Sequence, residues 1–247
     1  MFSKGKWFFF DSIDSTNSRA LQMASLQNAP EGSVIMANYQ EKGRGQRGSD
    51  WQSNKGENIL MSVILYPSFL LPKKIFSLNQ AIALAVYDTV AAHVNEKINI
   101  KWPNDIMVND KKIAGILIES SFRGEEIANS VIGVGMNVNQ KSFDDFNLRV
   151  ISLVSITSQH FDLNVLAKSL RNKIEFWYTS LKQGNFQLIN EFYHGRLYRL
   201  NEFSKYKIKN EEVLGTIRGV NETGKLIFEK ENGDVLNLDN KEIVFVI

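Results

Sequence analysis

Residues 112–120 (KIAGILIES) and 127–137 (IANSVIGVGMN) are two apolar runs rich in β-branched residues, and the turn residues Arg123-Gly124 lie between them. This pattern predicts two long strands joined as an antiparallel hairpin. A shorter run, residues 106–108, precedes the hairpin across a second turn, Asn109-Asp110. The middle of the chain is therefore predicted to form adjacent antiparallel strands.

Helices are predicted on both sides of these strands. Residues 77–94 and 162–182 repeat apolar side chains at helical spacing, which is typical of helices that pack on a core. Ser15 or Thr16 is placed to cap an earlier helix that runs through Leu26. Residues 7–10 (WFFF) are interpreted as a buried strand, because Asp11 ends the apolar run too early for a signal sequence or a membrane span.

After residue 200 the pattern changes to short alternating strands separated by turns rich in Asn and Gly. Such a pattern predicts a small β-barrel. We therefore divide the chain into a catalytic domain, residues 1–200, and a C-terminal domain, residues 201–247. The fold class is predicted as α+β with a mixed, largely antiparallel sheet.

Composition narrows the function without naming it. The 29 basic and 27 acidic residues are evenly mixed and leave a formal charge of +2. The sequence therefore lacks the excess of basic residues that is typical of general nucleic-acid binding. The chain has no cysteine, which excludes disulfides, thiolate metal sites and a cysteine acyl-enzyme. Its three histidines are scattered without the spacing of metal ligands. A cytoplasmic enzyme is compatible with these features.

One loop combines three glycines with two arginines. Residues 43–51 (GRGQRGSDW), here called the Gly/Arg loop, follow a predicted strand over residues 33–40. Glycines expose backbone N–H groups to a ligand, and arginine side chains match the oxygens of carboxylates and phosphates. The loop is interpreted either as a site for an anionic small molecule or as a solvated surface turn.

Three segments downstream favour a ligand site over a surface turn: residues 101–106 (KWPNDI), 112–119 (KIAGILIE) and 133–139 (GVGMNVN). Together with the Gly/Arg loop, Gln40 and residues 14–17 (DSTN), they resemble the catalytic domain of biotin protein ligases. The resemblance runs from about residue 10 to the C-terminus. It matches the short form of the family, without an N-terminal DNA-binding helix-turn-helix.

The resemblance implies both a fold and a reaction. The catalytic domain is expected to be like class II aminoacyl-tRNA synthetases, and the C-terminal domain like an SH3 barrel. Biotin and ATP are expected to form biotinyl-5′-AMP in the presence of Mg²⁺, and the biotinyl group is then expected to pass to one lysine of a biotin carboxyl carrier protein or domain. The resemblance further implies no DNA partner, no membrane, and a monomer or weak homodimer in the cytoplasm.

Site residues follow from the same resemblance. The expected biotin contacts are Ser15, Thr16, Asn17, Gln40, Arg44, Gly45, Gln46, Lys112 and Gly115. Contacts to ATP or the adenylate are expected from Arg44, Arg47, Lys112 and Asn137. The residues expected to carry catalysis are Lys112, Arg44 and Asp105.

For some of these residues the sequence leaves alternatives. Lys112 is either a solvated lysine after a turn or a cation directed at the carboxylate and α-phosphate, with Gly115 leaving room for the ligand. Asp105 is a Mg²⁺ ligand, a proton acceptor for the incoming lysine, or a cap of the turn after Pro103. Asn137 faces the nucleotide, or the Gly-x-Gly before it marks a β-bulge. Many relatives carry arginine where this chain has Gln46, so this loop has one fewer cation.

Two other functions are weighed against the biotin ligase. A lipoate or octanoate ligase or transferase shares the ancestral fold, but members that transfer without ATP typically need a cysteine, and this chain has none. A regulator that senses biotin or binds the adenylate without ligase activity is the alternative of a different class. The missing DNA-binding residues count against it.

Overall fold

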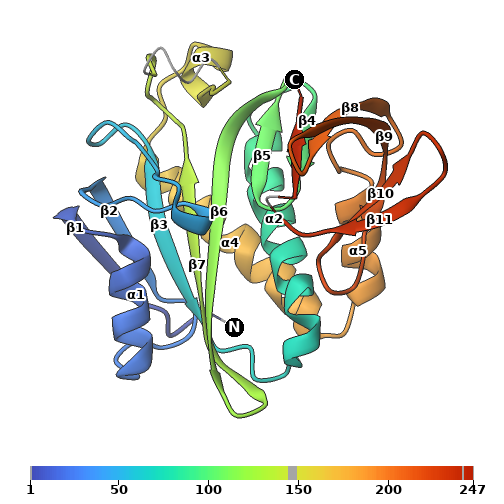
Figure 1. The fold of residues 1–247 in the computed structure, drawn as a ribbon. Helices are drawn as coiled ribbons and strands as arrows, with labels where there is room; N and C mark the ends of the chain where they lie inside the picture. Colours follow the sequence, from blue (N-terminus) through green and yellow to red (C-terminus); the bar gives the residue numbers. More distant parts are fainter. Residues whose placement is uncertain (1, 144–148, 241, 247) are drawn as a thin grey trace.

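The computed structural model describes residues 2–143, 149–240 and 242–246, and within these residues the chain forms two sheets and a set of helices (Figure 1). The larger sheet has seven strands in the order β1-β2-β3-β7-β6-β5-β4, and the smaller has five in the order β11-β10-β9-β8-β12. The predicted α+β class with a mixed sheet is confirmed.

The larger sheet begins with a parallel pair. β1 (Trp7–Ile13) pairs in parallel with β2 (Val34–Gln40), and α1 (Thr16–Ser25) connects them. The remaining pairs of this sheet are antiparallel, as predicted. They are formed by β3 (Ile59–Leu65), β4 (Ile98–Lys101), β5 (Asp105–Val108), β6 (Lys111–Arg123) and β7 (Glu126–Met136).

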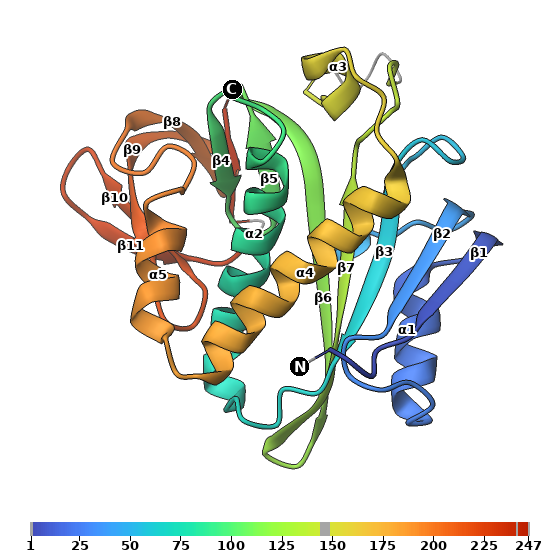
Figure 2. The same ribbon diagram turned by 180° about the vertical axis from the view of Figure 1, so that it is seen from behind.

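One face of the larger sheet is covered by two long helices. α2 (Ile75–Ala91) and α4 (Leu163–Lys182) lie side by side on the face of the sheet that is toward the viewer in Figure 2, with η2 (Pro72–Lys74) leading into α2. Together with the sheet they enclose the large apolar core. α1 lies on the opposite face, where Ala20 and Ala24 pack against Ile35, Ile64 and Val131 in a smaller cluster. The uncovered part of that face is left for the pocket described below.

Caps explain where two of these helices begin. Ser15 precedes α1, and its hydroxyl accepts a hydrogen bond from the Ser18 backbone N–H, as the sequence predicted. The Asp162 carboxylate accepts from the backbone N–H groups of Asn164 and Val165 at 2.8 and 3.2 Å, so α4 begins one residue after it. These side chains satisfy N–H groups that have no partner inside the helix.

The C-terminal sheet packs against the β4 end of the larger sheet. Its strands are β8 (Phe203–Ile208), β9 (Glu211–Val220), β10 (Leu226–Lys230), β11 (Val235–Leu238) and β12 (Ile243–Phe245). The Tyr198 backbone N–H donates to the Ile100 carbonyl at 2.9 Å, and the Trp102 indole N–H donates to the Gly224 carbonyl at 2.9 Å. The Trp102–Gly224 bond therefore joins the C-terminal domain to the turn after β4, and the Tyr198–Ile100 bond holds the segment that leads into this domain against β4.

The structure corrects one sequence prediction and adds two helices. Residues 7–10 form a strand, but the prediction that it is buried is wrong: β1 is the edge strand of the sheet, and Phe9 is 59% exposed. Because an edge strand has a neighbour on one side only, its apolar side chains are only partly covered. The short helices α3 (Leu153–Thr157) and α5 (Phe186–His194) were not predicted. Among the described residues, no helix is both long and apolar enough to cross a membrane.

Candidate functional site

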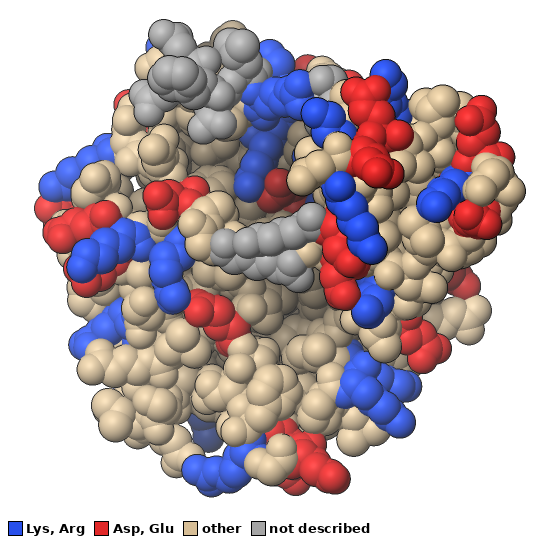
Figure 3. Space-filling view, in the orientation of Figure 1, with Lys and Arg blue, Asp and Glu red and all other residues tan. Residues whose placement is uncertain are grey.

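A pocket of about 460 Å³ opens on the face of the larger sheet that α2 and α4 leave free. The Gly/Arg loop, which contains the short helix η1 (Gln46–Gly48), and the β12 end of the C-terminal domain form the other walls. In Figure 3 this face is hollowed beside the C-terminal domain, and basic side chains stand at the upper rim of the hollow. The volume suits a small organic ligand with polar groups.

Strand register explains why residues from four different strands share this pocket. Lys101 pairs with Asp105, Asp105 with Gly115, and Gly115 with Gly135. Residues that are directly paired across neighbouring strands point to the same face of a sheet. The four residues therefore form one row across β4, β5, β6 and β7, and all four line the pocket.

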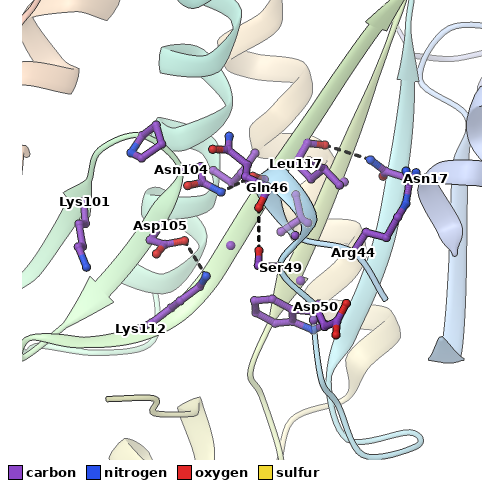
Figure 4. A pocket seen from close by; sticks show the side chains of 18 of the residues that line it. Asn17, Arg44, Gln46, Ser49, Asp50, Lys101, Asn104, Asp105, Lys112 and Leu117 are labelled. Carbon is purple, nitrogen blue, oxygen red and sulfur yellow. Dashed lines mark hydrogen bonds and ion pairs between the residues drawn. The ribbon is translucent and has the colours of Figure 1, made fainter. Parts of the chain in front are cut away.

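An ion pair stands beside this row. Lys112 Nζ lies 2.7 Å from Asp105 Oδ1, and the two side chains are 32% and 21% exposed (Figure 4). The same ammonium lies over the Trp51 ring, 5.4 Å from its centroid. A partly buried ammonium held in this way is fixed in position and still open to a ligand in the pocket. The structure thus brings together the two residues whose roles the sequence left open.

Positive charge gathers at this end of the pocket. Burial lowers the pKa of the Lys101 ammonium, Asp105 opposes that shift, and the nearby cations Lys112, Arg149 and Arg199 add to it. Lys101 Nζ also lies 5.0 Å from the centroid of the Phe245 ring. Lys101, Lys112 and Arg149 line the pocket together with Asp105, and such a surplus of cations attracts an anion with several charges.

Two glycines of β7 are required because side chains from other elements lie against the strand. A Cβ atom on Gly135 would overlap the Trp51 indole, and one on Gly133 would overlap the Asn17 carboxamide. On β6, a Cβ atom at Gly115 would lie 3.0 Å from Trp51 and 3.2 Å from the Lys112 side chain. The glycines therefore let Trp51 and Asn17 lie flat on the floor of the pocket.

The opposite end of the pocket is lined by hydroxyl and amide groups. The Thr16 backbone N–H and side-chain hydroxyl both donate to Gln40 Oε1, at 2.7 and 2.9 Å. Ser62 lies beside them on β3 and contacts the Thr16 hydroxyl and the Asn17 carboxamide oxygen. These groups come from α1, β2 and β3, and their mutual hydrogen bonds hold them in place before any ligand arrives.

Arg44 makes a contact that the sequence did not indicate. Its Nη2 atom lies 3.1 Å from Glu119 Oε2 and 3.2 Å from the Ser18 hydroxyl. The same Glu119 oxygen accepts from Asn17 Nδ2 at 2.8 Å. Glu119 thus links the Gly/Arg loop to α1. Its place in the segment KIAGILIE was visible in the sequence, but its role depends on β6 facing α1.

Most of the predicted site residues meet in this pocket. The ones that line it are Ser15, Thr16, Asn17, Gln40, Arg44, Gly45, Gln46, Asp105, Lys112 and Gly115. Asn137 is buried directly after β7, and the structure places it outside the lining. The side chain of Arg47 lies outside the described part of the chain.

Of the lining residues that the sequence did not assign to the site, four come from the C-terminal domain: Asn240, Ile243, Val244 and Phe245. Nothing in their sequence signals a site, since alternating apolar residues predict only a strand. Their position follows from the packing of β12 beside β4.

Carboxylates do not gather in the pocket in the way a metal cage requires. Within the described residues, no group of three His, Cys, Asp or Glu side chains is placed to hold a metal ion. Asp105 and Asp50 are carboxylates of the pocket lining, and Asp105 is paired with Lys112. The chain itself therefore offers few oxygen ligands for Mg²⁺, an ion that usually keeps several waters and substrate phosphates.

Comparison with known proteins places this arrangement in a family. The sequence profile of the Biotin/lipoate A/B protein ligase family matches residues 9–137. The Bifunctional ligase/repressor BirA of Bacillus spizizenii is 32% identical over 227 residues, which cover 90% of this chain and 69% of that protein. The Biotin--[acetyl-CoA-carboxylase] ligase of Paracoccus denitrificans is 29% identical over 229 residues, which cover 89% and 92% of the two chains.

The fold agrees with this match. The biotin protein ligase of Aquifex aeolicus, solved in complex with biotin and ATP, superposes with a TM-score of 0.80 and 23% identity over 97% of both chains. At that identity the likeness concerns the fold alone. The sequence profile, the relatives and the fold agree, and the chain belongs to the Biotin/lipoate A/B protein ligase family.

Proposed function

We propose that this protein is an ATP-dependent biotin–protein ligase, which activates biotin as biotinyl-5′-AMP and then transfers the biotinyl group to one lysine of a biotin carboxyl carrier protein or domain. The curated relatives named as biotin ligases support this activity. The observation that carries the proposal is the polarity of the pocket, with neutral hydrogen-bonding groups at one end and a surplus of cations at the other.

The neutral end favours biotin over lipoate. Ser15, Thr16, Asn17 and Gln40 offer hydroxyl and amide groups that match the donors and acceptors of a ureido ring. The dithiolane ring of lipoate has no N–H or C=O group, so it would leave these polar groups without partners on burial. A site built to hydrogen-bond its substrate rejects analogues that lack those groups.

The cationic end suits the first chemical step. A carboxylate oxygen of biotin attacks the α-phosphorus of ATP, the bond from that phosphorus to the bridging oxygen of the β-phosphate breaks, and pyrophosphate leaves. Two anions must approach each other, and charge grows on the phosphoryl oxygens. Lys112 is held by Asp105 in the wall of the pocket, where it can offset this charge, and Lys101 lies next to Asp105 in the row across the strands, toward the C-terminal domain.

The second step needs an amine from the partner protein. The carrier lysine attacks the acyl carbon of the adenylate, the bond from that carbon to the phosphate oxygen breaks, and AMP leaves. Asp105 is the carboxylate beside Lys112, and it is a candidate to accept the proton of the incoming amine. Mg²⁺ would arrive bound to the phosphates of ATP, with Asp105 as the residue that would hold it, and would supply positive charge there.

Finer features of the proposal concern the fold and the setting. We assign the larger sheet to the class II synthetase-like type and the C-terminal sheet to the SH3-like type, which the mixed and antiparallel topologies support. Arg44 and Gln46 are proposed to contact the ligand from the Gly/Arg loop, and Arg47 and Asn137 are retained as proposed nucleotide contacts on the sequence resemblance alone. We also propose a cytoplasmic setting for the reaction, on the sequence resemblance alone.

The test is acid-specific pyrophosphate release. The purified protein is incubated with ATP and Mg²⁺ and with either biotin or lipoate. We expect pyrophosphate release with biotin and little with lipoate, followed by labelling of a carrier domain on one lysine. Release with lipoate and not with biotin would replace the proposed substrate, and release with neither acid would reject the ligase activity.

A further inference from the structure

The Gly/Arg loop is a compact hairpin that bonds mainly to itself. The Trp51 backbone N–H donates to the Gly43 carbonyl at 3.0 Å and closes its base. Inside it, the Gly45 N–H donates to the Ser49 carbonyl at 2.6 Å, and the Ser49 hydroxyl donates to the Gln46 carbonyl at 2.9 Å. A hairpin with a closed base and internal bonds moves as a unit about that base.

At the base of this hairpin Trp51 lies against Gly135. Beyond the base, two side chains of its described part bond to other elements, one on each side of the pocket. On the α1 side, Arg44 bonds to Glu119 and to Ser18. On the other side, Gln46 Oε1 accepts a hydrogen bond from Asn240 Nδ2 at 2.8 Å. Gln46 and Asn240 both line the pocket, and 194 positions separate them in the sequence.

Asn240 is a fixed point for the loop because its own surroundings are tied to the larger sheet. It lies between β11 and β12 and forms a bridge with Ile243. β12 pairs with β8, the Trp102–Gly224 hydrogen bond joins the C-terminal domain to the turn after β4, and the Tyr198–Ile100 bond holds the segment before this domain against β4. The loop cannot swing away from the C-terminal domain without breaking the Gln46–Asn240 contact.

From this geometry we infer that Asn240 is a positioning residue that holds the Gly/Arg loop closed over the pocket and slows the escape of the acyl-adenylate before transfer. The inference rests on the proposed function, because it concerns the intermediate of that reaction. Asn240 acts through Gln46 and needs no contact with the reacting atoms. An acyl-adenylate is a mixed anhydride that acylates any accessible amine, so its retention decides which proteins are labelled.

A neutral hydrogen bond suits this task because it is weak. The loss of one such bond changes an opening equilibrium by about fivefold. The loop therefore stays mostly closed, and it still opens often enough to admit substrates and the carrier lysine. Arg44 and Glu119, by contrast, form a charged contact, which is stronger. We expect the loop to open first on the side of the C-terminal domain.

The first experiment needs no ligand. Amide hydrogen exchange of residues 43–51 is compared between the native protein, Asn240→Ala and the matched control Asn237→Ala. Asn237 is exposed on β11, where its backbone pairs with Ile227, and lies outside the pocket; within the described residues its side chain bonds to the Asn221 side chain. We expect exchange in the loop about fivefold faster in Asn240→Ala and unchanged in the control. Equal exchange in all three proteins would overturn the inference.

A conservative variant separates the contact from general damage. In Asn240→Asp the new carboxylate accepts from the Gln46 amide after that amide rotates by half a turn, because a Gln side chain offers both donors and an acceptor. Exchange in the loop should return to the native rate. Fast exchange in both Asn240→Asp and Asn240→Ala would mean that the substitutions disturb the fold around Asn240 and do not act through one contact. That result would refute the role of Gln46 as the partner of Asn240.

The second experiment follows the intermediate. Radiolabelled biotinyl-AMP is formed on the protein, and its release is measured after dilution. We expect release about fivefold faster in Asn240→Ala and at least as fast in Gln46→Ala, which also loses its proposed ligand contact. The double variant should be no faster than Gln46→Ala alone, because the Asn240 substitution then removes nothing further. Additive effects would contradict the proposed pairing. If the native protein forms no adenylate, the proposed function fails, and hydrogen exchange alone still decides whether Asn240 closes the loop.

Discussion

Lys112→Ala is the substitution that tests the proposed chemistry most directly. Lys112 Nζ is fixed by Asp105 at 2.7 Å and by the Trp51 ring, so the pocket holds its charge in place before ATP binds. Loss of one preorganised charge of this kind lowers the rate of the chemical step by about 10² or more, which corresponds to about 3 kcal/mol. We expect adenylate formation, measured as pyrophosphate release, to fall by that factor.

The same substitution should also affect stability, by a smaller amount. It leaves the Asp105 carboxylate, whose side chain is 21% exposed, without its cation. For a partly buried group we expect a loss of about 1–2 kcal/mol in the free energy of unfolding. In a chain of this size that corresponds to a fall of roughly 2–8 °C in Tm, read by thermal denaturation.

A double variant separates the two effects. Lys112→Ala with Asp105→Asn removes both charges, so Tm should recover most of the loss while adenylate formation stays low. Lys97→Ala is the matched control, because Lys97 pairs with Glu202 at 3.7 Å outside the pocket. Its rate should equal that of the native protein. Near-native adenylate formation in Lys112→Ala, or its recovery in the double variant, would refute the role assigned to Lys112.

Three further predictions concern other parts of the molecule. Lys101→Met should raise the KM for ATP by about tenfold or more, because the substitution removes a cation from the phosphate end of the pocket. It should not lower Tm, because burial disfavours the charge of this ammonium. A lower Tm with an unchanged KM would contradict this prediction. Hydrogen exchange of residues 43–51 should slow when biotinyl-AMP binds, since like charges and glycines gain order around an anion, and equal exchange with and without the adenylate would count against the loop as a binding element. Tyr193→Phe should leave the free energy of unfolding unchanged or raise it by about 1 kcal/mol in urea denaturation, because no described residue bonds to this buried hydroxyl; a loss above that amount would reveal a partner.

The sequence by itself determined the strands of the larger sheet and the long helices that pack on it. Apolar runs rich in β-branched residues, with turn residues at 109–110 and 123–124, predict β5, β6 and β7, because strand propensity and turn chemistry are local properties. The caps of α1 and α4 are local too. The exposed position of β1 could not be predicted in this way. An edge strand and a buried strand have similar apolar sequences, and only the order of strands in the sheet distinguishes them.

The candidate site was determined in part by the same local patterns. Motifs of Gly, Arg, Lys and Asp marked the Gly/Arg loop and the segments that contain Asp105 and Lys112, since the chemistry needs those residue types. The sequence did not reveal what each side chain touches. That Lys112 pairs with Asp105 depends on the register of β5 and β6, and that Gly135 carries the Trp51 indole depends on the fold of a loop 84 positions away.

Contacts between distant segments were decided by tertiary structure alone. Glu119 meets Arg44 because β6 faces α1, and Asn240 meets Gln46 because the C-terminal domain packs beside β4. Such contacts depend on how whole elements pack, and packing is set by many weak apolar interactions that no short stretch of sequence encodes. Residue types and local sequence patterns thus predict the chemistry and the strands of this protein, while the packing of the C-terminal domain beside β4 and of the Gly/Arg loop against β6 and α1 placed the groups that close the pocket.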